Sequence, residues 1–162
     1  MIQPTPAELA EVELLLGRVP EGEFSVAAKR VTGGIVVIEN APFLRDGRPM
    51  PTRYWLVDPV LRASVSRLES SGGVRQAERE VDPQAIQSAH ERSEVARTMT
   101  LGPDTGQPRP TGGIGGTRTG VKCLHAHLAV FLIDGEDPVG AWTAARLQES
   151  GIDLVGIERS NG

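Results

Sequence analysis

Residues 121–132 read VKCLHAHLAVFL, and Lys122 is the only Lys, Arg, Asp or Glu among them. If this segment is helical, its apolar positions cover most of the helix circumference. Such a helix is typically buried on more than one side. The segment therefore predicts a largely buried helix over residues 121–134, placed at the centre of the fold.

The polar side chains of this predicted helix need an explanation. Cys123 and His127 share one face, one turn apart, while His125 lies beside the main apolar stripe. A cysteine on an apolar helix is usually a small core residue, and a buried histidine is usually satisfied by a carbonyl or a carboxylate. However, the chain's only Cys and two of its three His fall within five residues here. We therefore consider both a structural and a functional interpretation of this cluster.

The first functional interpretation is anion binding. Residues 112–120, GGIGGTRTG, lead directly into the predicted helix. Free backbone N–H groups at a helix start, with cationic side chains and hydroxyls, can hold a phosphate or a carboxylate. The segment lacks the Lys-Ser/Thr ending of a Walker loop and the spacing of a dinucleotide fingerprint. The alternative is a flexible connector with solvated cations. The candidate ligand-binding residues are Gly115, Gly116, Arg118, Thr119, Lys122 and His125.

The second functional interpretation is catalysis by Cys123 and His127. The two side chains could be ligands of a transition metal, or a thiol polarised by an imidazole. Zinc needs two further ligands, or one ligand and a water, and His90 with an Asp or Glu is the weaker candidate for these places. For a nucleophile, a helix N-terminus lowers the pKa of a thiol in the first turn. This interpretation predicts a thiol- or metal-dependent hydrolase or transferase.

Local signals predict the helices around this segment. The dipeptide Asp-Pro occurs three times, and in each case Asp can supply a cap oxygen and Pro the preset φ of a first helical residue. The helices predicted from these pairs are 59–70, 83–98 and 138–149. Thr5-Pro6-Ala7-Glu8 has the form of a capping box and predicts a helix that ends at Gly17. A helical turn is expected over 75–81.

The strands are predicted from β-rich runs. Residues 24–31 and 35–40 flank Thr32-Gly33-Gly34 and predict a hairpin. A third strand is predicted over 52–57 and a last strand over 152–158. Between the helices, residues 101–120 contain seven Gly and three Pro, which argues against regular structure. A loop of this length in a compact domain is either functional or disordered.

Length and composition limit the class of protein. A chain of 162 residues with 39% hydrophobic and 23% charged residues has the size and composition of one globular domain. Its formal net charge of -4 argues against a broad nucleic-acid surface, which needs clustered Lys and Arg.

No stretch approaches the roughly 20 apolar residues of a membrane span, and residues 1–4 lack the pattern of a signal peptide. Cys123 is the only cysteine, so no intrachain disulfide can form. We therefore expect a cytoplasmic protein.

Several segments together resemble the actinobacterial proteins grouped as domain-of-unknown-function family 501. The most specific segment is 120–127, GVKCLHAH, with 137–140, DPVG. The other matching segments are 46–47 with Pro49, 51–52, 54–56, 66–69 and 89–91. The resemblance spans about residues 24–140 and implies a single-domain bacterial protein of unassigned activity.

These observations predict an α+β fold in a single domain over 1–162, with an irregular loop at 101–120. A small, mainly antiparallel sheet would pack against four or five helices, one of them largely buried. The function that the sequence favours is a binding module for a small phosphate- or carboxylate-bearing ligand at the glycine-rich loop and the 121–134 helix. The thiol- or metal-dependent enzyme and an interaction protein with purely structural histidines are the alternatives. The sequence specifies no cofactor and no oligomeric state.

Overall fold

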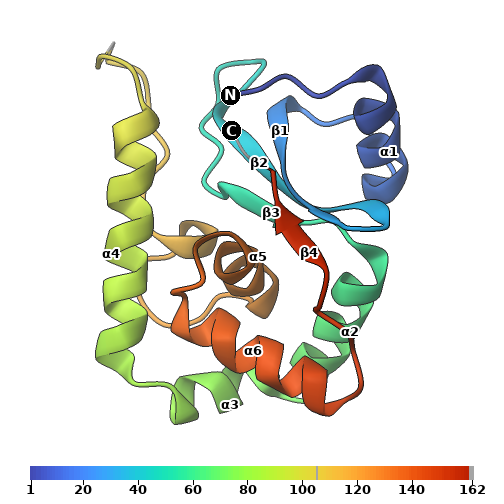
Figure 1. The fold of residues 1–162 in the computed structure, drawn as a ribbon. Helices are drawn as coiled ribbons and strands as arrows, with labels where there is room; N and C mark the ends of the chain where they lie inside the picture. The colour runs from blue at the N-terminus through green and yellow to red at the C-terminus, as the bar shows by residue number, and fades with distance from the viewer. Residues whose placement is uncertain (105, 161–162) are drawn as a thin grey trace.

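Four strands within the described residues, 1–104 and 106–160 of a computed structural model, form one antiparallel sheet in the order β3-β2-β1-β4. The strands are β1 (Gly22–Arg30), β2 (Gly33–Leu44), β3 (Tyr54–Leu56) and β4 (Ile157–Arg159). β1 and β2 form the predicted hairpin, with β3 added beside β2 and β4 beside β1 (Figure 1). The predicted α+β class with an antiparallel sheet is confirmed.

The strands differ from their predicted bounds at the ends. β2 begins at Gly33 because this residue pairs with Arg30, so the hairpin loop is shorter than Thr32-Gly33-Gly34. β2 also continues past the predicted end at 40, because Leu44 pairs with Gly22. The last strand begins later than predicted, since the chain turns first at Gly156, whose φ of 72° lies in the left-handed region.

Six α-helices lie within the described ranges, one more than the largest number expected. They are α1 (Pro6–Leu16), α2 (Pro59–Ser70), α3 (Gly73–Glu80), α4 (Pro83–Thr100), α5 (Leu124–Asp134) and α6 (Pro138–Glu149). The extra helix is α3, where the sequence predicted only a turn. Among these described helices, none is both long and apolar enough to cross a membrane.

The helix starts follow the predicted capping chemistry. Asp58, Asp82 and Asp137 each accept a hydrogen bond from a backbone N–H in the first turn of the helix that follows. Thr5 and Glu8 form the predicted capping box at α1, and Gly17 ends that helix in the left-handed conformation. Local sequence therefore fixes where four of the helices begin.

The central helix is the exception, because α5 begins at Leu124 and not at residue 121 as predicted. Cys123 is its N-cap residue, with an extended backbone (φ −155°, ψ 148°). The reason lies outside the segment. The backbone N–H of Val121 donates to Glu78 Oε1 of α3 at 2.9 Å, and that of Leu124 donates to Glu69 Oε1 of α2 at 2.6 Å. These two carboxylates bind backbone N–H groups on either side of Lys122 and Cys123, so the helix begins only at Leu124.

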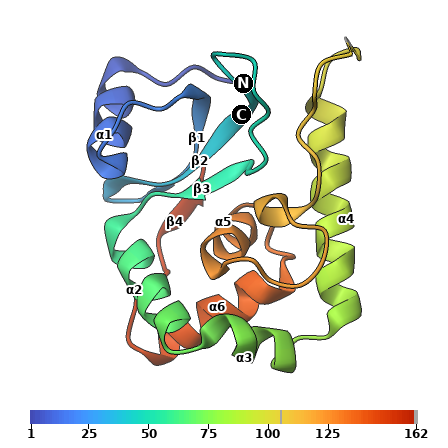
Figure 2. The same ribbon diagram turned by 180° about the vertical axis from the view of Figure 1, so that it is seen from behind.

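The helices cover the two faces of the sheet unequally. α1 packs on one face, where Val12 joins Phe24 and Ile38 in a small core. The other face carries the main core, in which Leu124 and Leu128 of α5 are fully buried. Figures 1 and 2 show α5 enclosed by the sheet and the remaining helices. The expectation of a largely buried central helix is confirmed.

The described residues of 101–120 are mostly irregular, but part of this segment is ordered against the core. A short 3₁₀ turn, η1 (Ile114–Gly116), lies within it, and Gly112, Gly113 and Ile114 are buried. The glycines that argued against regular structure therefore allow close packing here.

A close approach of α5 and α6 yields a stability prediction. A Cβ added at Gly140 would overlap Cβ of Phe131 and the carbonyl of His127. Gly140→Ala is therefore expected to lower the free energy of unfolding by about 1–3 kcal/mol. Helix propensity alone predicts a gain of about 0.5–1 kcal/mol for the same change, so the sign of the effect is informative.

Urea unfolding followed by circular dichroism measures this change. Gly102→Ala is the control, because a Cβ at Gly102 meets nothing within 4 Å, and its effect should stay within about 0.5 kcal/mol. A stabilised Gly140→Ala variant would show that α5 and α6 are not in this contact.

Candidate functional site

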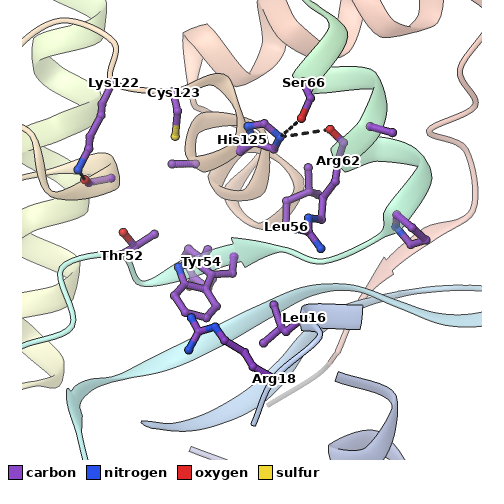
Figure 3. A pocket seen from close by; sticks show the side chains of 15 residues that line it. Leu16, Arg18, Thr52, Tyr54, Leu56, Arg62, Ser66, Lys122, Cys123 and His125 are labelled. Atoms are coloured by element: carbon purple, nitrogen blue, oxygen red, sulfur yellow. Dashed lines mark hydrogen bonds between the residues drawn. The ribbon is translucent and has the colours of Figure 1, made fainter. Parts of the chain in front are cut away.

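A pocket of about 770 Å³ lies where four parts of the chain meet (Figure 3). These are the C-terminal end of α1, the strand β3, the first part of α2, and the start of α5 with Gly115 of the glycine-rich loop. In Figure 3, β3 crosses the pocket, with Ser66 and His125 on one side of it and Leu16 and Arg18 on the other. The pocket therefore joins residues that are distant in sequence.

The lining of this pocket is positively charged. Arg18, Arg62 and Lys122 line it together with His125, whereas none of the fifteen lining residues is Asp or Glu. The whole chain has the opposite balance, with 21 acidic residues against 17 Lys and Arg. The concentration of positive charge at one pocket is thus a local feature that the net charge conceals.

Two of the three cations are held by backbone carbonyl groups. Arg62 donates from Nη1 to the Leu15 carbonyl at 2.9 Å, and Lys122 donates from Nζ to the Gly115 carbonyl at 3.2 Å. Within the described part of the chain, neither residue forms an ion pair with a carboxylate. These two cations consequently keep an unneutralised charge at the pocket.

Arg18 differs from the other two cations. Its Nη1 pairs with Glu21 Oε1 at 2.9 Å, and its guanidinium lies 5.6 Å from the centre of the Trp55 ring. Its charge is therefore partly neutralised and its position is set by the aromatic ring.

His125 is oriented by three neighbouring groups. Its Nδ1–H donates to Glu69 Oε1 at 3.2 Å, and Nε2 lies 3.3 Å from the Ser66 hydroxyl and 3.2 Å from the Arg62 carbonyl (Figure 3). A neutral ring accepts the Ser66 hydroxyl proton at Nε2, while a protonated ring donates there to the Arg62 carbonyl. Glu69, Ser66 and the Arg62 carbonyl therefore hold both ring nitrogens of His125 in place.

Cys123 also lines the pocket, as the N-cap residue of α5. Burial raises the pKa of the Cys123 thiol, and the opposing effect of the Ala126 backbone N–H is smaller. The prediction that the helix N-terminus would lower this pKa is therefore wrong, because desolvation outweighs the helix. The thiol is protonated at neutral pH.

His127 lies away from the pocket, in the core. Its ring is 1% exposed, and Nδ1–H donates to the Asp137 carboxylate at 3.0 Å. Asp137 also caps α6, so this pair joins the two helices. Cys123 and His127 therefore face different surroundings, and the pocket lining contains only the first of them.

His90 fastens the glycine-rich loop to α4. Its Nδ1 accepts from the Ile114 N–H at 3.1 Å, and its Nε2–H donates to the Gly120 carbonyl at 2.8 Å. These two bonds fix the neutral tautomer and use both ring nitrogens. Its ring meets that of His127 edge-on, with 5.5 Å between centroids. No group of three or more His, Cys, Asp or Glu side chains is placed to hold a metal ion in 1–104 or 106–160.

The backbone amides of the glycine-rich loop are largely occupied. The N–H groups of Gly113, Gly116 and Thr117 donate to carbonyls of the same loop, and that of Gly112 donates to Glu94. The side chains of Arg118 and Thr119 are exposed and, like Gly116, do not line the pocket. Of the candidate ligand-binding residues, the pocket unites Gly115, Lys122 and His125.

Sequence reasoning missed the residues that other elements bring to this pocket. Arg62 and Ser66 occupy one face of α2, one turn apart, and Arg18 follows the end of α1. The spacing of Arg62 and Ser66 was the only available signal, and a solvated helix face has the same spacing.

The sequence matches the family model described as "Protein of unknown function (DUF501)" over residues 26–145. The chain belongs to this family. The matched range runs from β1 into α6, so Arg62, Lys122 and His125 lie inside it while Arg18 lies outside. The resemblance seen in the sequence is thereby confirmed for DUF501. No curated protein and no solved structure matched the chain.

The role of His90 can be tested by substitution. His90→Ala leaves the buried Ile114 N–H without an acceptor, which is expected to cost about 1–3 kcal/mol of stability. Amide hydrogen exchange at Ile114 should become faster. His125→Ala is the control, because the hydrogen bonds of His125 go to Glu69, Ser66 and Arg62 and none of them to Ile114. Unchanged exchange at Ile114 in the His90→Ala variant would show that His90 does not hold the glycine-rich loop.

The raised pKa of Cys123 predicts slow alkylation at neutral pH. Since only the thiolate reacts, the rate with iodoacetamide should rise at a higher pH than for N-acetylcysteine, whose thiol has a pKa of about 8.5. The measurement is the pH dependence of alkylation of this single cysteine by mass spectrometry. A midpoint at a lower pH than that of N-acetylcysteine would instead support the hypothesis of an activated thiol.

Proposed function

We propose that the protein is a binding module for a phosphate or carboxylate group, which it holds in the pocket between β3, α2 and the start of α5. The observation that carries this proposal is the lining, which contains three cations and a histidine but no carboxylate. Opposite charge from a ligand would compensate Arg62 and Lys122, which have only neutral carbonyl partners.

The start of α5 brings a helix N-terminus and a carboxylate close together. A helix N-terminus carries partial positive charge and favours anions. Glu69 accepts from the Leu124 N–H, but its carboxylate does not line the pocket. Of the two charged side chains next to this helix start, Lys122 lines the pocket and Glu69 does not.

The proposed site differs from the sequence prediction in its donors. The prediction relied on loop amides with Arg118, Thr119, Lys122 and His125. We now assign the ligand contacts to Arg62, Lys122 and His125, because these side chains line the pocket, whereas five of the nine amides of residues 112–120 already donate within the protein. Gly115 stays part of the site through its carbonyl, which positions Lys122.

The thiol-dependent enzyme has less support. A nucleophilic cysteine needs a base within hydrogen-bond reach and a lowered pKa. Burial raises the pKa of Cys123, and His127 is bound to Asp137. Cys123 then contributes to the shape of the pocket as a small, weakly polar side chain.

Isothermal titration with inorganic phosphate and with acetate tests the proposal. At least one of these ions should bind, with an affinity that falls as ionic strength rises. Lys122→Ala and Arg62→Ala should each weaken binding about tenfold, the loss expected for one charge-assisted contact.

Arg118→Ala is the matched control, because this exposed arginine lies close to Lys122 in sequence but outside the pocket lining. It should bind as the unmodified protein does. Binding that is lost only in Arg118→Ala would return the site to the glycine-rich loop, and no binding of either ion would count against any anion site.

A further inference from the structure

The pocket lies across the free edge of the sheet. Successive side chains of a strand point to opposite faces, and those of β3 divide accordingly. Trp55 packs with the α1 core, whereas Tyr54 and Leu56 pack with the core on the α5 side. All three line the same pocket. A single pocket that collects side chains from both faces must pass around the edge of β3.

The hydrogen-bond register shows which backbone groups point to this edge. The Asn40 N–H donates to the Arg53 carbonyl, and the Val57 N–H donates to the Val36 carbonyl. Residues in an antiparallel pair alternate between bonded and non-bonded positions. With Trp55 opposite Ile38, the odd-numbered residues of this segment pair with β2. The N–H and C=O groups of Tyr54 and Leu56 therefore point away from β2.

No further strand takes these groups, since β3 is the last strand at this end of the sheet in the described residues. An unpaired strand edge is a template for another extended chain. The pocket is also much larger than one phosphate or acetate ion requires, and apolar side chains such as Leu16, Trp55 and Leu56 form part of its lining. Size, apolar lining and a strand edge without a neighbouring strand thus coincide at one place.

We propose that the occupant of this pocket is an extended peptide segment with a carboxylate, which adds a strand to the edge of β3. Its backbone would pair with Tyr54 and Leu56, and its carboxylate would lie against Lys122, Arg62 or His125. The inference rests on the proposed function, because the same cations bind the anionic group, and it names the class of partner. The carboxylate belongs either to a chain terminus or to an acidic side chain.

The test is isothermal titration of the full chain with short acetylated peptides. One probe is Thr-Val-Thr-Val-Glu amide, which carries a side-chain carboxylate, and the other is Thr-Val-Thr-Val-Gln with a free C-terminus. A third has the first sequence with backbone N-methyl groups on alternate residues, which removes strand donors without a change in charge. Acetate supplies the reference for the carboxylate alone.

One of the first two peptides should bind at least about tenfold more tightly than acetate, and which one binds identifies the source of the carboxylate. N-methylation removes the strand pairing and should therefore reduce the affinity of the peptide to that of acetate. Lys122→Ala should weaken the binding of the peptide and of acetate alike. Hydrogen exchange at the Tyr54 and Leu56 amides should slow with the peptide and not with acetate.

Two results separate the claims. If acetate or phosphate binds but the peptides bind no more tightly, or if the N-methylated peptide binds equally well, the strand addition is wrong and the anion site stands. If acetate, phosphate and all peptides fail to bind, the proposed function and the strand addition both fail.

Discussion

The carboxylate of Glu69 determines how the central helix meets the rest of the protein. Its Oε1 accepts hydrogen bonds from the Leu124 N–H at 2.6 Å and from His125 Nδ1 at 3.2 Å. Glu78 likewise accepts from the Val121 N–H. With these two N–H groups bound to other elements, α5 begins at Leu124, and Cys123 is its extended N-cap residue. Lys122 and Cys123 line the pocket. Neither carboxylate is part of the lining, although Glu69 bonds to His125, which is.

The three histidines have three different environments in the same small protein. His90 fastens the glycine-rich loop with both ring nitrogens. His127 joins α5 to α6 through Nδ1, while its buried Nε2 has no hydrogen-bond partner among the described residues. Only His125 reaches the pocket. We therefore propose a ligand role only for the polar side chains at the start of this helix, which line the pocket, and not for His127 in its middle. Depth along the helix, which the sequence pattern does not encode, separates the two cases.

Much of the fold was predictable because its signals are local. Asp-Pro pairs and the Thr5–Glu8 box act within one helical turn, and they placed four helix starts correctly. The start of α5 was not predictable in this way, since the carboxylates that set it lie 55 and 43 residues away in sequence. The same holds for the candidate site. Lys122 and His125 were found from the sequence, whereas Arg18 and Arg62 come from other elements and no local sequence pattern identifies them. Membership of DUF501 covers Arg62 and Lys122 but supplies no ligand.

The central claim is that the start of α5, and not the glycine-rich loop, faces the anion. Backbone amide chemical shifts during a phosphate titration measure this directly, residue by residue. The account predicts that the largest changes occur over residues 122–126, with Gly113, Ile114 and Thr117 unaffected because their N–H groups already donate within the protein. Changes concentrated at Arg118, Thr119 and the loop glycines, with residues 122–126 unaffected, would contradict it.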